Sequence, residues 1–152
     1  MSPAARTHSA LPHTADAGFV AAASTLPELF EEAGSALAEL VADLDASVEA
    51  SRWDAVALDA VDLTGLAFGW LNELIALADV HRSVIVTTRI DRLECPAAPT
   101  GNGPWRLQGR VGLRAADAAG VRLLHEAKSA TYHRLTVGRI GHRWTLRAYI
   151  DI

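Results

Sequence analysis

Two aspartates, one near each end of the chain, stand at unusual positions, and the one at the C-terminal end has the chemistry of a metal ligand. Asp16 stands in "LPHTADAGF", residues 11–19, directly before a run of small apolar residues that predicts a buried strand. Asp151 is the penultimate residue, and the α-carboxylate of Ile152 would add another anionic group beside it. Carboxylate oxygens are the ligands that hard cations such as Ca²⁺ and Mg²⁺ prefer. Spacing does not show whether Asp16 and Asp151 meet, and an exposed tail with screened charges is the alternative for Asp151 and Ile152.

Other residues of types that can take part in catalysis or binding have simpler structural interpretations. Lys128 begins a predicted strand at 128–139, where lysines usually occupy solvated or edge positions. Cys95 stands alone, and a lone cysteine is usually an inert small hydrophobe. The chain contains no GxSxG, P-loop, GxGxxG after a strand, CxxC or closely spaced histidine pair. The sequence therefore shows no candidate base, nucleophile or substrate pocket, which argues against a stand-alone metal-dependent hydrolase.

Two amphipathic helices are predicted in the first half of the chain. Thr25 followed by Glu28 is a capping-box pattern that starts a helix within residues 24–45. Asp62 caps a second helix. Apolar residues recur at helical spacing in both segments. These stripes are Leu26, Leu29, Phe30, Ala33, Leu37, Leu40, Val41 and Leu44 in the first and Leu63, Leu66, Ala67, Trp70, Leu71, Leu74 and Ala78 in the second.

Strand signals surround and follow these helices. Short strands are predicted at 18–24 and 53–59, and after residue 80 the apolar period changes to two. The later strands are 84–91, 105–114, 128–139 and 144–151. The order β-α-β-α-β-β-β-β indicates an α+β fold, a two-layer sandwich with two helices packed on a largely antiparallel sheet. We expect a flexible N-terminal arm at residues 1–10 and a single domain at 11–152.

One face of the predicted strand 105–114 is basic. Arg106, Arg110 and Arg114 alternate there with apolar residues. A solvated sheet face is the simple interpretation, and a docking face for a partner is the functional one.

Composition limits the function further. The chain has 152 residues, half of them hydrophobic, and a net charge of −4. An acidic chain is poorly suited to grip nucleic acid by counterion release, so we expect no strong direct binding of nucleic acid. The sequence contains no apolar run of about 18 residues, the length needed to span a bilayer. Its first residues lack the apolar segment of a secretory signal. One cysteine fits a reducing environment, so we expect a cytoplasmic protein without membrane contact.

Taken together, five motifs in register resemble the archease family. They cover residues 11 to 152, nearly the whole chain. The motifs are "HTADAGF" at 13–19, "STLPELFEEAGSAL" at 24–37, "WLNELIAL" at 70–77, "EAKSATYHRL" at 126–135 and the ending "YIDI" at 149–152.

The resemblance implies a function that composition does not reveal. Archeases are non-enzymatic accessory proteins of the GTP-dependent RNA ligase that acts in tRNA splicing and RNA repair, and they promote its guanylylation and multiple turnover. They carry a divalent metal, here expected to be Ca²⁺ with Mg²⁺ or Mn²⁺ as alternatives. The resemblance makes Asp16, Asp151 and Ile152 the metal ligands. It assigns Lys128 to the face that activates the ligase.

Two points stay open within this resemblance. His13 either orients Asp16 through a hydrogen bond or finishes the turn before the strand. The alternative function is a general chaperone or adaptor for RNA- or DNA-modifying enzymes such as methyltransferases, which would use the face of Arg106, Arg110 and Arg114.

Overall fold

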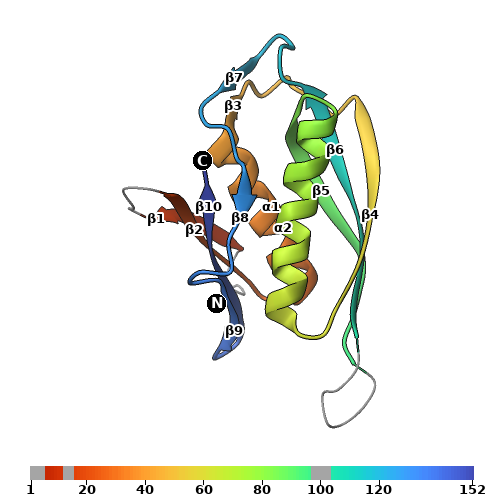
Figure 1. Cartoon of the computed structure of the whole chain (residues 1–152), viewed down its shortest axis with the longest axis vertical. Coiled ribbons are helices and arrows are strands. Elements are labelled where there is room, and N and C mark those ends of the chain that lie inside the picture. Colours follow the sequence, from red (N-terminus) through yellow and green to blue (C-terminus); the bar gives the residue numbers. More distant parts are fainter. Residues whose placement is uncertain (1–5, 12–15, 97–103) are drawn as a thin grey trace.

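The computed structural model describes residues 6–11, 16–96 and 104–152, and within these residues two helices lie between two sheets (Figure 1). The helices are α1 (Leu26–Val41) and α2 (Leu63–Val80). The strands are β1 (Thr7–Leu11), β2 (Asp16–Ala23), β3 (Ala42–Leu44), β4 (Arg52–Ala60), β5 (Ser83–Glu94), β6 (Trp105–Ala115), β7 (Val121–Leu123), β8 (Ser129–Ala130), β9 (Thr136–Ile140) and β10 (Arg143–Asp151).

Every strand pair in the described part of the chain is antiparallel, which confirms the α+β class. The single sheet drawn from the sequence is instead divided. One sheet runs β1-β2-β10-β8 with β9 also on β10, another runs β4-β6-β5, and β3 pairs with β7. α1 packs on β2 and β5, while α2 packs on β4 and β8, so each helix contacts both larger sheets. A sequence pattern shows that a helix has an apolar face, but it does not show how many sheets share that face.

Both helices begin where the sequence predicts. The Thr25 hydroxyl accepts a hydrogen bond from the Glu28 amide at 3.3 Å, and an Asp62 carboxylate oxygen accepts one from the Gly65 amide at 2.7 Å. These caps satisfy amides that have no partner in the first helical turn.

The core lies between the sheets, around the largest fully buried side chain, Trp70. Its indole N–H donates to the carbonyl oxygen of Phe30 at 2.9 Å and so ties α2 to α1. By length and composition alone α2 is able to cross a membrane, although polar residues such as Asn72 and Glu73 interrupt its apolar sequence. Because Leu66, Trp70 and Leu74 are fully buried, α2 serves here as a core helix.

Two predictions about secondary structure, a flexible N-terminal arm and a continuous strand at 128–139, are corrected. Within the flexible arm predicted at residues 1–10, residues 7–10 instead belong to β1, which pairs with β2. The predicted strand 128–139 is also wrong as a continuous element. It is divided into β8 and β9 by a turn in which Arg134 has a φ of 60°, a left-handed conformation that interrupts strand geometry.

Candidate functional site

The strand pairing of β2 and β10 places the two predicted aspartates opposite each other. Asp16 and Asp151 are cross-strand partners at the ends of their strands, and both are half-buried. Side chains of directly opposed residues lie on the same face, with Cβ atoms about 4.5–5.5 Å apart. Phe19 and Ile150, at positions of the other parity, are buried in the core, so the carboxylates face away from it. Asp16 and Asp151, whose proximity could not be inferred from the sequence, therefore lie side by side.

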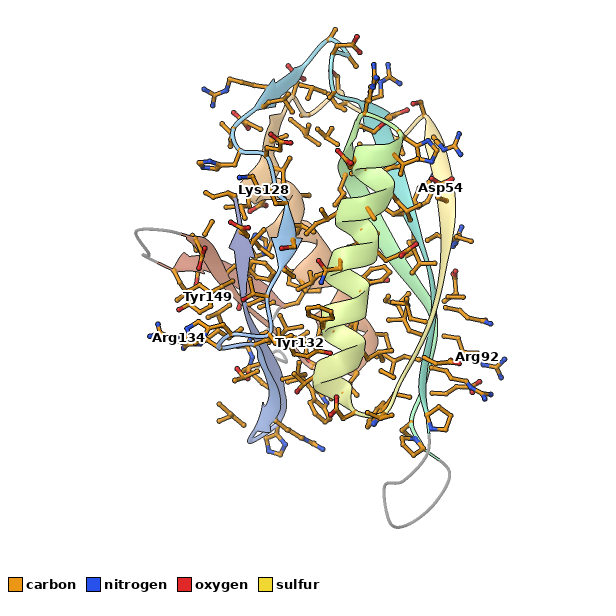
Figure 2. The ribbon with its side chains drawn as sticks, in the orientation of Figure 1. Asp54, Arg92, Lys128, Tyr132, Arg134 and Tyr149 are labelled. Atoms are coloured by element: carbon orange, nitrogen blue, oxygen red, sulfur yellow. The ribbon has the colours of Figure 1, made fainter. Side chains whose placement is uncertain are left out.

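A close contact one step along the same face fixes this register. Tyr149 lies opposite Gly18, and a Cβ atom at position 18 would stand 2.6 Å from Cε1 of Tyr149. Tyr149 is 4% exposed although it points away from the core, and the guanidinium carbon of Arg134 lies 5.9 Å from its ring centre. Figure 2 shows Arg134 and Tyr149 on this side of the sheet. Because only glycine admits the tyrosine ring, a slipped pairing would lose this contact.

Lys128 lies beside the aspartate pair. Its backbone N–H donates to the carbonyl oxygen of Asp151 at 2.8 Å, and the next residue, Ser129, pairs with Asp151 across β8 and β10. Lys128 precedes β8 and is exposed. In Figure 2 it lies near the end of β10, where Figure 1 marks the C-terminus. Three separated segments thus bring Asp16, Asp151 and the backbone of Lys128 together.

Asn72 of α2 is a site residue that the sequence reasoning missed. Its side-chain oxygen accepts from the Ala130 amide at 2.9 Å, and its NH₂ group donates to the Ala130 carbonyl at 3.3 Å. The amide thereby replaces a neighbouring strand along the edge of β8. Lys128 and Asn72 also line a cleft of ≈ 470 Å³, together with the acidic Asp79 and Glu126. The asparagine stood within "WLNELIAL", but helical spacing alone does not show which backbone it would contact.

The remaining predicted site residues are Ile152 and His13. Ile152 is half-buried and packs against the core. His13 lies outside the described residues. No group of three or more His, Cys, Asp or Glu side chains in the described part of the chain is arranged to hold a metal ion. A cation at the Asp16–Asp151 pair would therefore need main-chain oxygens or water beside the two carboxylates, an oxygen-only donor set that suits Ca²⁺ or Mg²⁺.

A second charged cluster secures β1, the strand that leads towards Asp16. His8 contacts Glu32 through Nδ1 and Glu39 through Nε2, and both glutamates belong to α1. Arg6 also pairs with Glu32, at 3.2 Å. Partial burial lowers the pKa of His8, but hydrogen bonds to Glu39 and Glu32 outweigh it, and the pKa is raised above its usual value. With both ring nitrogens facing carboxylates, the imidazolium is the form that satisfies both contacts.

Comparison with known proteins agrees with this architecture. Residues 8–152 match the model of the Archease protein family. A protein archease from Methanosarcina barkeri is 26% identical over 152 residues, covering all of both chains. Another from Pyrobaculum neutrophilum is 31% identical over 143 residues, covering 92% of this chain and 91% of its own.

Two solved structures have the same fold. The solution structure of protein 1598 of Methanobacterium thermoautotrophicum superposes with a TM-score of 0.75 at 25% identity, covering 95% of this chain and 98% of that one. The crystal structure of an archease from Thermotoga maritima, described as a possible chaperone, has a TM-score of 0.57 at 19% identity, covering 93% and 94%.

Proposed function

Because the chain belongs to the archease family, we propose that it is a metal-binding accessory protein that activates a GTP-dependent RNA ligase in tRNA splicing or RNA repair. It would promote guanylylation and multiple turnover of the ligase without catalysing a reaction itself. A cytoplasmic location is part of this proposal, since the chain has one cysteine and needs no disulfide.

The observation that carries the proposal is the meeting of Asp16 with Asp151 beside Lys128. Two half-buried carboxylates on adjacent strands repel each other, and like charges directly opposed destabilise a sheet. A bound divalent cation, Ca²⁺ in the first instance, would neutralise both. Asp16, Asp151 and the main-chain oxygen of Ile152 are the donors that we assign to it.

The chain's own residues would act by position and charge. Asn72 and the β8–β10 pairing hold the backbone of Lys128 next to Asp151, so that the exposed Lys128, at the cleft beside α2, and the carboxylate pair lie at the same end of this sheet. Phosphoryl and nucleotidyl transfer depend mainly on positioning and on neutralising phosphate charge. We propose that this surface contacts the ligase near its nucleotide site and favours the arrangement in which guanylylation proceeds.

The test is multiple-turnover ligation with purified ligase and limiting accessory protein. Asp16→Asn, Asp151→Asn and Lys128→Met are each expected to reduce the stimulation, whereas Glu49→Gln, an exposed control in the loop before β4, should leave it unchanged. Calorimetric titration with Ca²⁺ should show binding that Asp16→Asn and Asp151→Asn weaken by about tenfold or more, since affinity follows ligand charge. Stimulation that stays at the wild-type level in all three variants would refute the proposal.

A general chaperone is the second candidate, because the Thermotoga maritima protein is described as a possible chaperone. Such a protein would protect several unrelated enzymes, including methyltransferases, from heat-induced aggregation. Light scattering of the ligase and of an unrelated methyltransferase, heated with equal amounts of the protein, separates the two candidates. Protection of both enzymes, unaffected by Asp151→Asn, would favour the chaperone.

A further inference from the structure

The outward face of the β4-β6-β5 sheet carries the arginine stripe that the proposed function does not use. The helices cover the other face of this sheet, and Figure 2 shows Arg92 extending away from them. Arg106 and Arg110 are exposed on the central strand β6, and Arg89 and Arg92 are exposed on β5. The face therefore combines two of the three arginines predicted on one strand with two arginines from a neighbouring strand, while the third predicted arginine, Arg114, is half-buried.

An exposed tryptophan lies on the same face. Trp53 of β4 is 45% exposed and stands opposite Gly112 of β6. A Cβ atom at position 112 would lie 2.8 Å from Cβ of Ala50 and 3.1 Å from Cζ2 of Trp53, so the edge of the indole packs closely over the glycine. Arg110 stands 5.7 Å from the ring centre. An open indole next to a guanidinium is the arrangement on which unpaired bases stack.

Some of the positive charges on this face do not stabilise the fold. Arg89 and Arg110 are direct cross-strand partners, and like charges in that relation disfavour sheet formation. Asp91 holds Arg110 with two hydrogen bonds at 3.0 Å, but Arg89 has no ion-pair partner within the described ranges. The pairs of Arg92 with Glu94 and Arg106 with Asp59 are exposed. Exposed pairs contribute little, so a phosphate can replace the carboxylate at small cost.

We propose that this sheet face binds single-stranded RNA, with Trp53 stacking on a base and Arg89 and Arg106 contacting phosphates. The choice of RNA over DNA rests on the proposed function in RNA repair. The overall charge of −4 remains compatible with this site, because few phosphates are contacted and the binding is modest and sensitive to salt. The face lies on a different sheet from Asp16 and Asp151, so one molecule is able to hold RNA and engage a partner at once.

The experiment measures fluorescence anisotropy of a labelled, unstructured RNA of about twelve nucleotides, a length that suits single-strand sites, with the full chain alone. Trp53→Ala is expected to weaken binding about tenfold, the loss typical of one stacked base. With the two phosphates contacted by Arg89 and Arg106, raising monovalent salt from about 50 to about 200 mM should weaken binding about sevenfold. Arg89→Glu should weaken binding, whereas the matched control Arg122→Glu, an exposed arginine on β7, should not.

A second measurement keeps the test decisive if Trp53→Ala is unstable. RNA should quench the tryptophan fluorescence of the wild type, and Trp53→Phe should retain binding but lose most of the quenching. The absence of binding at low salt, or equal binding by wild type, Trp53→Ala and Arg89→Glu, would overturn the proposal, as would tighter binding of DNA of the same sequence. If Trp53→Ala or Arg89→Glu lowers ligase stimulation while the wild type binds no RNA, the face docks a protein instead. Because the binding assay contains no ligase and no metal, its failure is distinct from failure of ligase activation.

Discussion

Replacing Asn72 with alanine tests how the short strand β8 holds Lys128 in place. Ala130, whose N–H donates to the Asn72 side chain and whose carbonyl accepts from it, is 3% exposed, so its N–H would lose a partner in a largely dry place. An unsatisfied buried group costs about 1–3 kcal/mol. The carbonyl contact is longer, at 3.3 Å, and Asn72 itself is half-buried, so water will replace part of the loss. We therefore expect Asn72→Ala to lower the free energy of unfolding by about 1–2 kcal/mol.

Urea denaturation and thermal melting measure that loss. For a domain of this size 1 kcal/mol corresponds to about 2–4 °C in Tm, so a decrease of about 2–8 °C is expected. Glu73→Ala, at the adjacent helical position, controls for the introduction of alanine into α2. Hydrogen exchange gives a local measure, since the amides of Ala130 and Lys128 should exchange faster in Asn72→Ala but not in Glu73→Ala. An unchanged Tm together with an equally protected Ala130 amide would show that Asn72 does not hold β8.

Further predictions concern β1 and the register of the site. Since Glu39 and Glu32 raise the pKa of His8, its contribution to stability is present below the unfolded pKa and is lost as pH rises through the folded one. Wild type should therefore exceed His8→Gln in urea resistance at about pH 5.5 but approach it at about pH 9, and a difference that grows with pH would contradict this. Gly18→Ala places a methyl group against the ring of Tyr149 and should cost about 1–3 kcal/mol of stability. Thermal melting checks it, and an unchanged Tm would mean that the ring moves freely.

The elements with a strong local signal were predictable. α1 and α2 follow from their apolar stripes and from the caps Thr25 and Asp62, because capping and helical periodicity depend on residues within a few positions of each other. β10 follows from the alternation of apolar and polar residues along it, with Tyr149 as the exception. Its parity predicts an exposed side chain, yet it is buried against Gly18 and Arg134 on the outer side of the sheet.

Elements that depend on distant partners were not predictable. The sequence of β1 shows no strand pattern. The strand forms because it pairs with β2 and because Arg6 and His8 make ion pairs with α1. The division of residues 128–139 depends on Arg134 in the left-handed conformation, which no local rule assigns to arginine. The number of sheets likewise depends on which strands meet across the helices.

The sequence by itself determined the residue types of the candidate site, Asp16, Asp151, Ile152 and Lys128, and through its motifs the resemblance to a family. Only the tertiary structure decided that Asp16 stands opposite Asp151, that the Lys128 backbone hydrogen-bonds to Asp151, and that Asn72 supports β8, the strand that follows Lys128. The physical reason is that residues far apart in the chain are brought together by sheet register and helix packing. Those arrangements are fixed by the sum of many contacts, of which the fit of Tyr149 over Gly18 is one, and no short stretch of sequence contains them.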